Sequence, residues 1–548
     1  MLETVRAFNA LSEEFVEVSM RHNPVAATRS GIHDYDHQLP DDSPEGFQDR
    51  AAWLRGMDQR LVASVPWDEL PTGPRVDYAL MRSAIAAARA DLEEIRVPAR
   101  NPVMYSETAM SGLFLLVARE FAPLEERKEA ILSRLMAIPD YLDAARANLQ
   151  HVPELFVRIA IEVNGCGPEF VDEVVRTLLR SFPGEAERIE HAGGRARAGF
   201  FRYQTFLEQE LGPRAGGSFA IGERWMNYKL EREHLLSMDC NYLEAFGREH
   251  VASTAAALEH EARRLDPSRS WRALIEEARV RHPEARKLRE AYVAEVERAR
   301  RFVVEKRLAP IPEAGIEVVD TPLFERPTLP YAAYLSPAPF DEEQTGLFYV
   351  TPVDLDLRRE AQEERLQGHC YASLPMTVVH EAFPGHHLQL CHANRTGSRL
   401  RRLASSDLLA EGWALYCEEL MVEHGFGLDP ATRLFQLKDQ MWRACRVVVD
   451  VGLQTGRMTV EQAVDYLVEQ AMVERSNAEM EVKRYTLTPT QPLCYLVGKE
   501  LLREIRGEAE QRLGAAFDLH DFHAELLSLG TIPPFLVRQE LHERLAPR

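Results

Sequence analysis

The stretch HEAFPGHHLQL, residues 380–390, brings a glutamate and three histidines close together in the sequence. It begins like the zinc-binding signature H-E-x-x-H, in which two imidazoles one helical turn apart reach the same metal ion. In that signature the glutamate lies beside a metal-bound water. Here Pro384 stands at the position of the second histidine, and His386 and His387 follow. The stretch therefore predicts a zinc site only if its helix is distorted.

Simple helix geometry shows why a distortion is needed. In a regular helix His386 points about 120° away from His380, and His387 lies about 10 Å further along the axis. Zinc–nitrogen bonds are only about 2.0–2.1 Å long, so neither histidine would reach a shared ion. Pro384 removes a backbone donor and Gly385 permits unusual backbone angles. We therefore predict a helix that widens or breaks between residues 381 and 386, and the residues alone leave either histidine as the second ligand.

A third ligand is expected in the downstream stretch DLLAEGWALYCEEL. Glu411 has the apolar helical neighbours Leu408, Ala414 and Leu415, and an unpaired carboxylate on such a face is costly. A buried metal ion would compensate that charge. Asp407, one turn earlier, is placed to accept a hydrogen bond from the ring nitrogen of a ligand imidazole that does not bind the metal. Each residue alone would suit a structural role, but the combination predicts one Zn²⁺ per chain.

Composition limits the classes of partner. The chain has 548 residues, 45% hydrophobic and 28% charged, with a formal net charge of −21. Basic residues form no stripe, so nucleic acid and anionic membranes are not expected as partners. The acidic N-terminus with helical apolar spacing, the lack of a long apolar run and seven scattered cysteines favour a cytoplasmic protein.

Apolar residues recur at helical spacing through most of the chain, which predicts a mainly α fold. The segment 308–356 differs, because it is rich in proline and contains short β-prone runs at 316–319, 331–335 and 347–350. We expect a helical part over 1–307, a small sheet near the active site within 308–356, and a helical part over 357–548 that carries the metal motif. These three parts are expected to interlock in one structural unit.

Several motifs resemble those of a known family. They are GIHDYDHQLPDDS at 31–43, REFAPLEERKEAILSRLMAIPDYLDAARANL from Arg119, VVHEAFPGHHLQL, EGWALYCEEL, and RVVVDVGLQTGRMTVEQAVDYL. Over nearly the whole chain they resemble the bacterial domain-of-unknown-function 885 (DUF885) family, which is itself similar to gluzincin-type zinc metallopeptidases. The resemblance implies a large multi-helix metallopeptidase-like fold with His380, His386 and Glu411 as ligands and Glu381 as the base. It also favours His386 over His387.

The chain departs from the family pattern in two places. Gln454 stands where the family usually has histidine, and the family's P-G-Q-A reads PTQP here, with Thr490 and Pro492 substituted. By analogy these positions lie near the substrate. The resemblance is therefore a better guide to metal binding than to substrate choice.

The predicted chemistry is hydrolysis by a metal-activated water. Glu381 directly follows a ligand and would take the proton of that water and deliver it to the leaving amine. An oxyanion also needs a donor, and Arg484, Tyr485 and Tyr495 are candidates, although both tyrosines would equally suit the core. Arg443 and Arg446 would bind a substrate carboxylate or pair with Asp450.

These residues predict a zinc-dependent hydrolase of short peptides. Two alternatives stay open: hydrolysis of a non-peptide amide or acyl compound at the same site, and a non-catalytic zinc protein that binds a peptide. Glu381 weighs against the latter, because a structural zinc needs no base. We expect the helices to enclose the zinc in a channel, with segment 308–354 as one wall that pairs with extended peptides.

Overall fold

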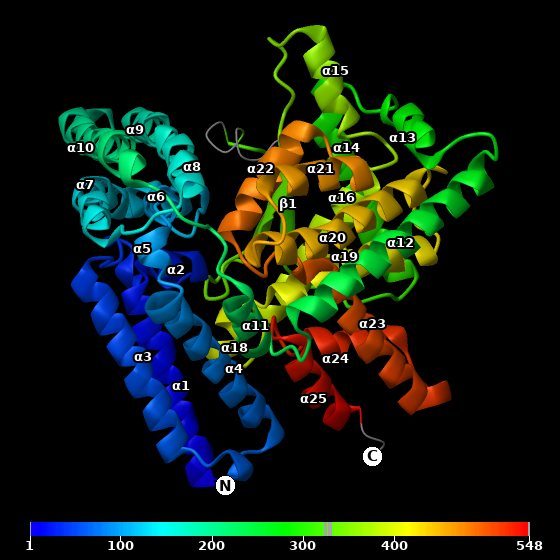
Figure 1. Cartoon of the computed structure of the whole chain (residues 1–548), viewed down its shortest axis with the longest axis horizontal. Coiled ribbons are helices and arrows are strands. Elements are labelled where there is room, and N and C mark those ends of the chain that lie inside the picture. Colours follow the sequence, from blue (N-terminus) through cyan, green and yellow to red (C-terminus); the bar gives the residue numbers. More distant parts are fainter. Residues whose placement is uncertain (1, 323–325, 327–330, 546–548) are drawn as a thin grey trace. The chain divides into compact units, whose positions relative to one another are not determined.

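Helices form almost all of the regular structure, and the fold is mainly α, as the apolar spacing predicts. The structure is a computed structural model that describes residues 2–322, 326 and 331–545. The first helix, α1 (Leu2–His22), buries Phe8, Leu11 and Phe15, which recur at the predicted interval. Figure 1 shows the course of the chain from blue at the N-terminus to red at the C-terminus.

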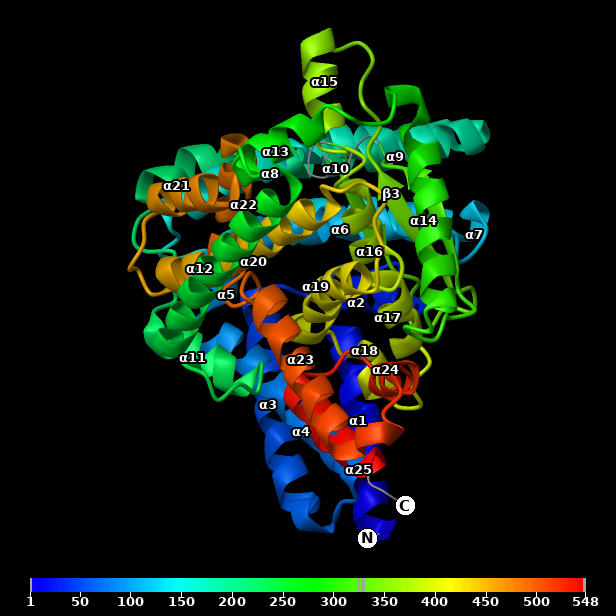
Figure 2. The ribbon, with the colours of Figure 1, turned by 90° about the vertical axis from the view of Figure 1, so that its right-hand side faces the viewer.

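The chain forms two compact units, and the first contains Met1–Ile221 together with Ala338–Glu343. In this unit α1 packs against α3, and α3 packs against α4, so that these helices lie side by side in Figures 1 and 2. Its α-helices are α1, α2 (Pro24–Ser30), α3 (Pro44–Ser64), α4 (Thr72–Arg89), α5 (Val97–Arg100), α6 (Val103–Ala118), α7 (Leu124–Asn148), α8 (Glu154–Gly165), α9 (Gly167–Ser181) and α10 (Ala186–Thr205).

The motif GIHDYD has a structural role within this first unit. Gly31 ends α2 with a φ of 82°, a left-handed conformation that glycine adopts at no steric cost. His33 then joins two acids, with Nδ1 2.8 Å from Asp36 and Nε2 3.0 Å from Asp341. Burial alone lowers the pKa of His33, but its bonds to Asp341 and Asp36 raise it to about 9. The motif thus anchors the short segment 338–343.

The second unit contains Gly222–Pro337 and Gln344–Arg548. Its α-helices are α11 (Glu223–Arg232), α12 (Cys240–Leu265), α13 (Trp271–Arg279), α14 (Leu288–Glu305), α15 (Arg359–Gln367), α16 (Leu374–Glu381), α17 (His386–Ala393), α18 (Arg399–Leu403), α19 (Asp407–Glu423), α20 (Thr432–Gln454), α21 (Val460–Ala471), α22 (Arg475–Leu487), α23 (Cys494–Leu513), α24 (Leu519–Leu527) and α25 (Pro534–Arg544).

A small sheet lies in the second unit where the β-prone runs were found. It has three strands in the order β1-β3-β2, with β1 (Gly315–Asp320) parallel and β2 (Ala332–Leu335) antiparallel to β3 (Thr345–Val350). Gly346 of β3 leaves room for the ring of Tyr334, which a Cβ at that position would overlap. The Tyr334 hydroxyl lies 2.8 Å from Nδ1 of His387, so the sheet contacts the metal motif.

Helices α19 and α23 pack unusually closely, and this contact fixes the region of the predicted site. A Cβ added to Gly412 of α19 would lie 2.5 Å from the carbonyl carbon of Gly498 of α23. In the opposite direction, a Cβ on Gly498 would overlap the carbonyl oxygen of Leu408. Only glycines permit this approach of two main chains. The residues just before the crossing, Glu411 and Tyr495, are thereby brought to one place.

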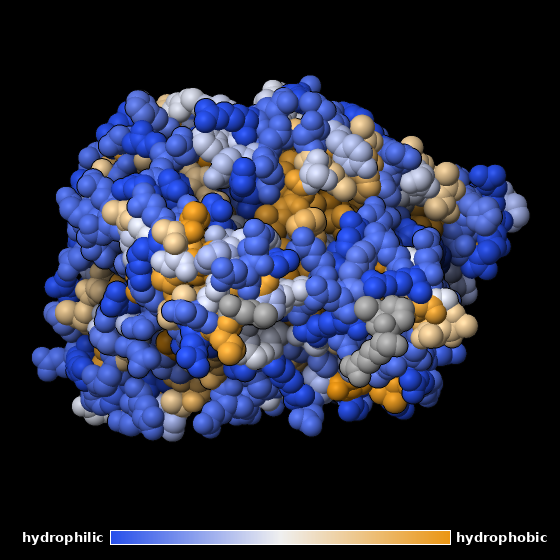
Figure 3. Space-filling model, turned by 90° about the horizontal axis from the view of Figure 1, so that it is seen from below, coloured by the Kyte–Doolittle hydropathy of each residue, from blue (hydrophilic) through white to orange (hydrophobic). Residues whose placement is uncertain are grey.

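The outer surface is largely hydrophilic on the face that Figure 3 shows, with separate apolar areas between the polar ones. Within the part of the chain that the structure describes, every helix is too short or too polar to span a bilayer. All seven cysteines are free thiols, and six of them are buried, which agrees with their scattered positions in the sequence.

Candidate metal centre

The metal motif occupies two short helices that meet at a break. Helix α16 ends at Glu381 and α17 begins at His386, so residues 382–385 leave the helical path. Across this break the Gly385 amide donates to the Val379 carbonyl at 3.0 Å. The predicted distortion is confirmed, and it is a full interruption rather than a widened turn.

The break is held by contacts that the sequence predicts only in part. A Cβ at Gly385 would overlap the carbonyl oxygen of His380, so glycine is required at this close approach. The indole Nε1 of Trp413 donates to the carbonyl of Pro384 at 2.7 Å. Since Trp413 belongs to α19, the helix that carries Glu411 also fixes the turn that redirects His386.

The three predicted ligands come together at this break. The Nε2 atoms of His380 and His386 lie 3.5 and 3.3 Å from the same oxygen, Oε2 of Glu411. The possible ligand atoms of the three residues all lie within 4.8 Å of one another. Zinc bonds of about 2.0–2.2 Å in tetrahedral geometry separate neighbouring ligand atoms by about 3.3 Å. The donor spacing therefore fits one zinc ion.

Burial and missing hydrogen bonds support the same conclusion. The side chains of His380, His386 and Glu411 are only 10%, 13% and 18% exposed. Among the described residues Glu411 Oε2 is buried without a hydrogen-bond donor, because the two imidazoles stand farther away than an ordinary hydrogen bond of about 2.7–3.2 Å. A buried carboxylate oxygen of this kind is costly unless a cation compensates it.

The electrostatics of the group also favour a cation beside Glu411. Burial by itself raises the pKa of Glu411, but the imidazoles of His386 and His380 outweigh burial and hold that pKa well below its usual range. Burial lowers the pKa of His380, while the nearby carboxylates of Glu411 and Glu418 raise it to about 10. The carboxylates thus stabilise positive charge at this point.

Glu418 is a functional candidate that the sequence analysis missed. Its Oε1 lies 2.8 Å from Nδ1 of His380, and the residue is 1% exposed. A carboxylate behind a ligand imidazole fixes the ring orientation and leaves the other nitrogen for the metal. Glu418 follows Glu411 by seven residues on α19, which places both on one helix face. That spacing was the available signal.

His387 does not belong to the centre. Its fully buried ring lies against β2, with Nδ1 2.8 Å from the Tyr334 hydroxyl and 3.6 Å from Cys391 Sγ. Burial lowers the pKa of His387 to about 4. Of the two alternatives that the sequence left open, the geometry favours His386 and assigns His387 to packing.

The predicted base lies beside the first ligand. Glu381 is the last residue of α16 and directly follows His380, and its carboxylate is one of the charges that raise the pKa of that imidazole. Its side chain is partly exposed, unlike those of the buried residues that follow it. This position suits a group that exchanges a proton with a water at the centre.

The three predicted oxyanion donors occupy two different positions. Tyr495 stacks on His380, with ring centroids 6.3 Å apart and an angle of 16° between the rings. Tyr485 is fully buried and accepts a hydrogen bond from Arg446 Nε at 2.7 Å. Arg484 donates to Gln491 at 2.9 Å and pairs with Glu481 at 2.9 Å. Tyr495 is therefore next to the ligands, whereas Tyr485 and Arg484 contact other groups.

Two expected pairings are not formed within the described residues. Asp407 does not hydrogen-bond a ligand imidazole; burial and the charge of Glu411 raise its pKa to about 7, and His386 Nδ1 has no partner. Arg446 pairs with Glu481 rather than with Asp450. Arg446 thus pairs across to α22, which carries Glu481, and not along its own helix α20.

The positions that depart from the family pattern have packing roles. Gln454 donates to the carbonyls of Tyr485 and Thr486 at 3.0 and 3.3 Å. Thr490 has a φ of 72° and its hydroxyl lies 2.8 Å from Nε2 of His234. Pro492 is buried. These residues support the segment between α22 and α23, which leads to Tyr495.

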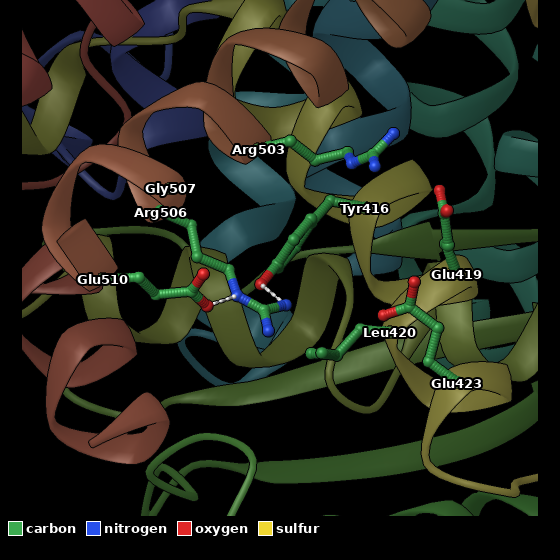
Figure 4. Close-up of a pocket in the computed structure, with 8 residues that line it drawn as sticks. All are labelled: Tyr416, Glu419, Leu420, Glu423, Arg503, Arg506, Gly507 and Glu510. Carbon is green, nitrogen blue, oxygen red and sulfur yellow. Dashed lines mark hydrogen bonds and ion pairs between the residues drawn. The ribbon is translucent and has the colours of Figure 1, made fainter. Parts of the chain in front are cut away.

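A surface pocket and an exposed cluster elsewhere in the second unit are less suitable sites. The pocket lies between α19 and α23, where Arg506 contacts both Glu510 and Tyr416 (Figure 4). Of its charged groups, Arg506 pairs with Glu510, Arg503 with Glu500 and Glu419 with Lys499. The cluster of Asp518, His520 and Asp521 lies near the start of α24 and is partly or fully exposed. Neither contains a residue of the motif at 380–390.

Solved structures share this fold. The chain is similar to a "putative lipoprotein of unknown function" from Shewanella oneidensis, with a TM-score of 0.81 and 24% identity over 98% of this chain and 99% of that one. It is also similar to a "putative lipoprotein" from Colwellia psychrerythraea, with a TM-score of 0.85 and 19% identity over 100% of both chains. Among curated proteins none matches this chain.

These solved structures overturn the prediction of a cytoplasmic protein, because both are described as putative lipoproteins. That prediction was drawn from the N-terminal segment and the isolated cysteines, and neither feature determines where a mature chain resides.

The likeness to gluzincin-type peptidases stays a prediction. The family itself is established, since the model of "Bacterial protein of unknown function (DUF885)" matches residues 24–541, and the chain belongs to the DUF885 family.

Proposed function

We propose that the protein is a zinc-dependent hydrolase that cleaves amide bonds of short peptides. The observation that carries the proposal is the position of one buried, otherwise unpaired Glu411 oxygen 3.3–3.5 Å from the Nε2 atoms of two histidines. His380, His386 and Glu411 would hold the ion. When bound, zinc supplies a Lewis acid that acidifies a water and polarises a carbonyl oxygen.

The surrounding residues have the chemistry that hydrolysis requires. Glu381 takes the proton of the attacking water and returns it to the amine of the leaving product. The ring of Tyr495 stacks on that of His380, and its hydroxyl donates to the oxygen that becomes negative as the water attacks. Glu418 holds His380 in the tautomer that leaves Nε2 free. Together these groups divide activation, protonation and charge stabilisation among separate residues.

The burial of the ligands supports a small or extended substrate. The ligand side chains are at most 18% exposed, so a folded protein surface would not reach them without large rearrangement. A short peptide presents an amide bond without such a surface. The same machinery would hydrolyse a non-peptide amide, and peptide and non-peptide substrates are distinguished by testing both.

Two histidines with one carboxylate also suit non-haem iron, so the identity of the metal needs a direct measurement. Glu381 favours hydrolysis, because a carboxylate that lies beside the ligands without belonging to the ligand set would have no role in holding the ion. Elemental analysis of the purified protein should give about one zinc per chain. Iron in place of zinc would contradict the proposal.

The decisive experiment measures cleavage of a pooled short-peptide library by mass spectrometry. Cleavage should stop after chelation and return when zinc is added. The Glu381→Gln protein should keep zinc but lose cleavage. Zinc retention with no cleavage of peptides or small amides by the unmodified protein would instead support a non-catalytic binding protein.

A further inference from the structure

Three arginines gather on the side of Tyr495 in the second unit. Arg443 and Arg446 lie one turn apart on α20, and their Cζ atoms are 5.8 and 4.4 Å from the centre of the Tyr495 ring. Arg484 on α22 joins them, since it and Arg446 bind the same acid, Glu481. We refer to Arg443, Arg446 and Arg484 as the arginine cluster.

The charges of the arginine cluster do not balance. Glu481 lies 3.0 Å from Arg446 and 2.9 Å from Arg484, so one carboxylate serves two guanidinium groups. Arg443 has Asp439 at 3.6 Å. Three positive groups thus meet two carboxylates, which leaves the charge of one further carboxylate to be supplied. This surplus occurs in a chain whose formal net charge is −21.

Hydrogen bonding at the arginine cluster is incomplete as well. Among the described residues Arg443 Nε, Arg446 Nη1 and the neighbouring Trp442 Nε1 are buried without an acceptor. Unsatisfied buried N–H groups are uncommon and costly, so a group of them on one turn calls for an acceptor. Arg443 and Arg484 keep 13% and 38% of their side-chain exposure, which gives such an acceptor a route from solvent.

The arginine cluster is close to the candidate metal centre. The Tyr495 ring connects the two, because it lies 6.3 Å from the His380 ring and 4.4 Å from the Arg446 guanidinium carbon. An extended peptide covers about 3.3–3.6 Å per residue. A carboxylate at the arginine cluster would therefore lie no more than three residues from a peptide bond at the centre.

We propose that the arginine cluster binds the free C-terminal carboxylate of a short peptide and that the bond cut at the metal centre lies within three residues of that terminus. Planar guanidinium groups bind carboxylates through two parallel hydrogen bonds, and a monoanion matches the single surplus charge. The inference rests on the proposed hydrolase function and specifies its substrate as short peptides with an unblocked C-terminus.

The test compares defined tripeptides and tetrapeptides, each prepared as the free acid and as the carboxamide. The zinc-loaded protein should cleave the acids with a kcat/KM at least about 50-fold higher than the amides. Arg443→Gln should remove most of this preference, mainly by raising KM for the acids. Arg433→Gln, which removes the same charge from another face of α20, should retain it. Equal cleavage of acids and amides would overturn the proposal while leaving the hydrolase intact.

If no peptide is cleaved, a second measurement tests the carboxylate site separately from the proposed hydrolase function. Saturation-transfer NMR on the Glu381→Gln protein with the same peptides measures binding without turnover. Binding of acids over amides that is lost in Arg443→Gln and in Arg484→Gln supports the carboxylate site even if hydrolysis fails. Absence of any preference for acids in both the cleavage and the binding measurements would reject the site.

Discussion

Glu418 Oε1 lies 2.8 Å from Nδ1 of His380, so the helix that supplies Glu411 also holds the imidazole that faces it. Both carboxylates therefore come from α19, two turns apart on one face. The arrangement makes α19 the element on which the geometry of the centre depends.

Removing the supporting carboxylate should weaken metal binding without removing a ligand. Glu418→Gln should lower zinc affinity about 10–100-fold, because the uncharged amide oxygen of glutamine is a weaker acceptor and makes the ring of His380 less basic. Competition with a chromophoric chelator measures the affinity. Glu423→Gln on the exposed end of the same helix is the matched control and should bind zinc normally. An unchanged affinity in Glu418→Gln would assign that contact to packing alone.

Replacing the base should separate metal binding from turnover. Glu381→Gln keeps the size of the side chain but cannot accept a proton, so kcat should fall by about 10²–10⁴-fold while zinc content stays the same. Metal analysis and initial rates on the same preparation check both parts. Normal turnover by this variant would require a different base.

The two adjacent histidines should respond differently to substitution. His386→Ala should abolish stoichiometric zinc binding, since it removes a ligand. His387→Ala should keep zinc but lower the melting temperature, because it leaves a cavity in place of a fully buried ring and removes the contact with Tyr334. The experiment combines elemental analysis with thermal melting. If the losses were reversed, His387 would be the ligand.

The stability of the metal-free protein should depend on pH through the protonation of His380. Its folded pKa is raised to about 10 from an ordinary value of 6.5, so its stabilising contribution is complete below pH 6.5 and is lost as pH rises toward 10. Zinc must displace that proton, and binding at pH 8 should release about one proton per ion. Calorimetry in buffers with different ionisation enthalpies measures the release. A release of no protons at pH 8 would contradict the raised pKa.

The crossing of α19 and α23 should not tolerate a methyl group. Gly498→Ala would place its Cβ against the Leu408 carbonyl, and we expect a loss of about 1–3 kcal/mol in the free energy of unfolding together with lower activity. Gly507→Ala on the same helix is the control. A Cβ there meets nothing within 4 Å, and the change should stabilise by about 0.5–1 kcal/mol. Similar behaviour of the two variants would exclude a tight crossing.

Local sequence features predicted the parts of the site that depend on local physics. The pair Pro384 and Gly385 indicated the break, and the apolar neighbours of Glu411 indicated a charge in need of a partner. The role of Glu418 was also visible in its spacing but was overlooked. The separation of Tyr495 from Tyr485 was not predictable, because it depends on how α20 packs against α22 and supplies Arg446.

Dependence on contacts between distant segments also limits what the sequence predicts about the sheet. Prolines and β-branched residues predicted three short strands at the observed positions. Their order, with β3 in the centre, depends on pairing between segments that are distant in sequence. The contact of Tyr334 with His387 follows from that order, and so the sequence alone could not exclude His387 as a ligand.

The glycine contact between Gly412 and Gly498 has a consequence for how this sequence can change. Because two main chains touch there, the spacing between Glu411 and Tyr495 is set by backbone dimensions that every amino acid shares. Side chains elsewhere along α19 and α23 can vary in size while the reacting groups keep their separation. The two glycines thus fix the distance between the helices at this point, and substitutions in the surrounding core need not move Glu411 relative to Tyr495.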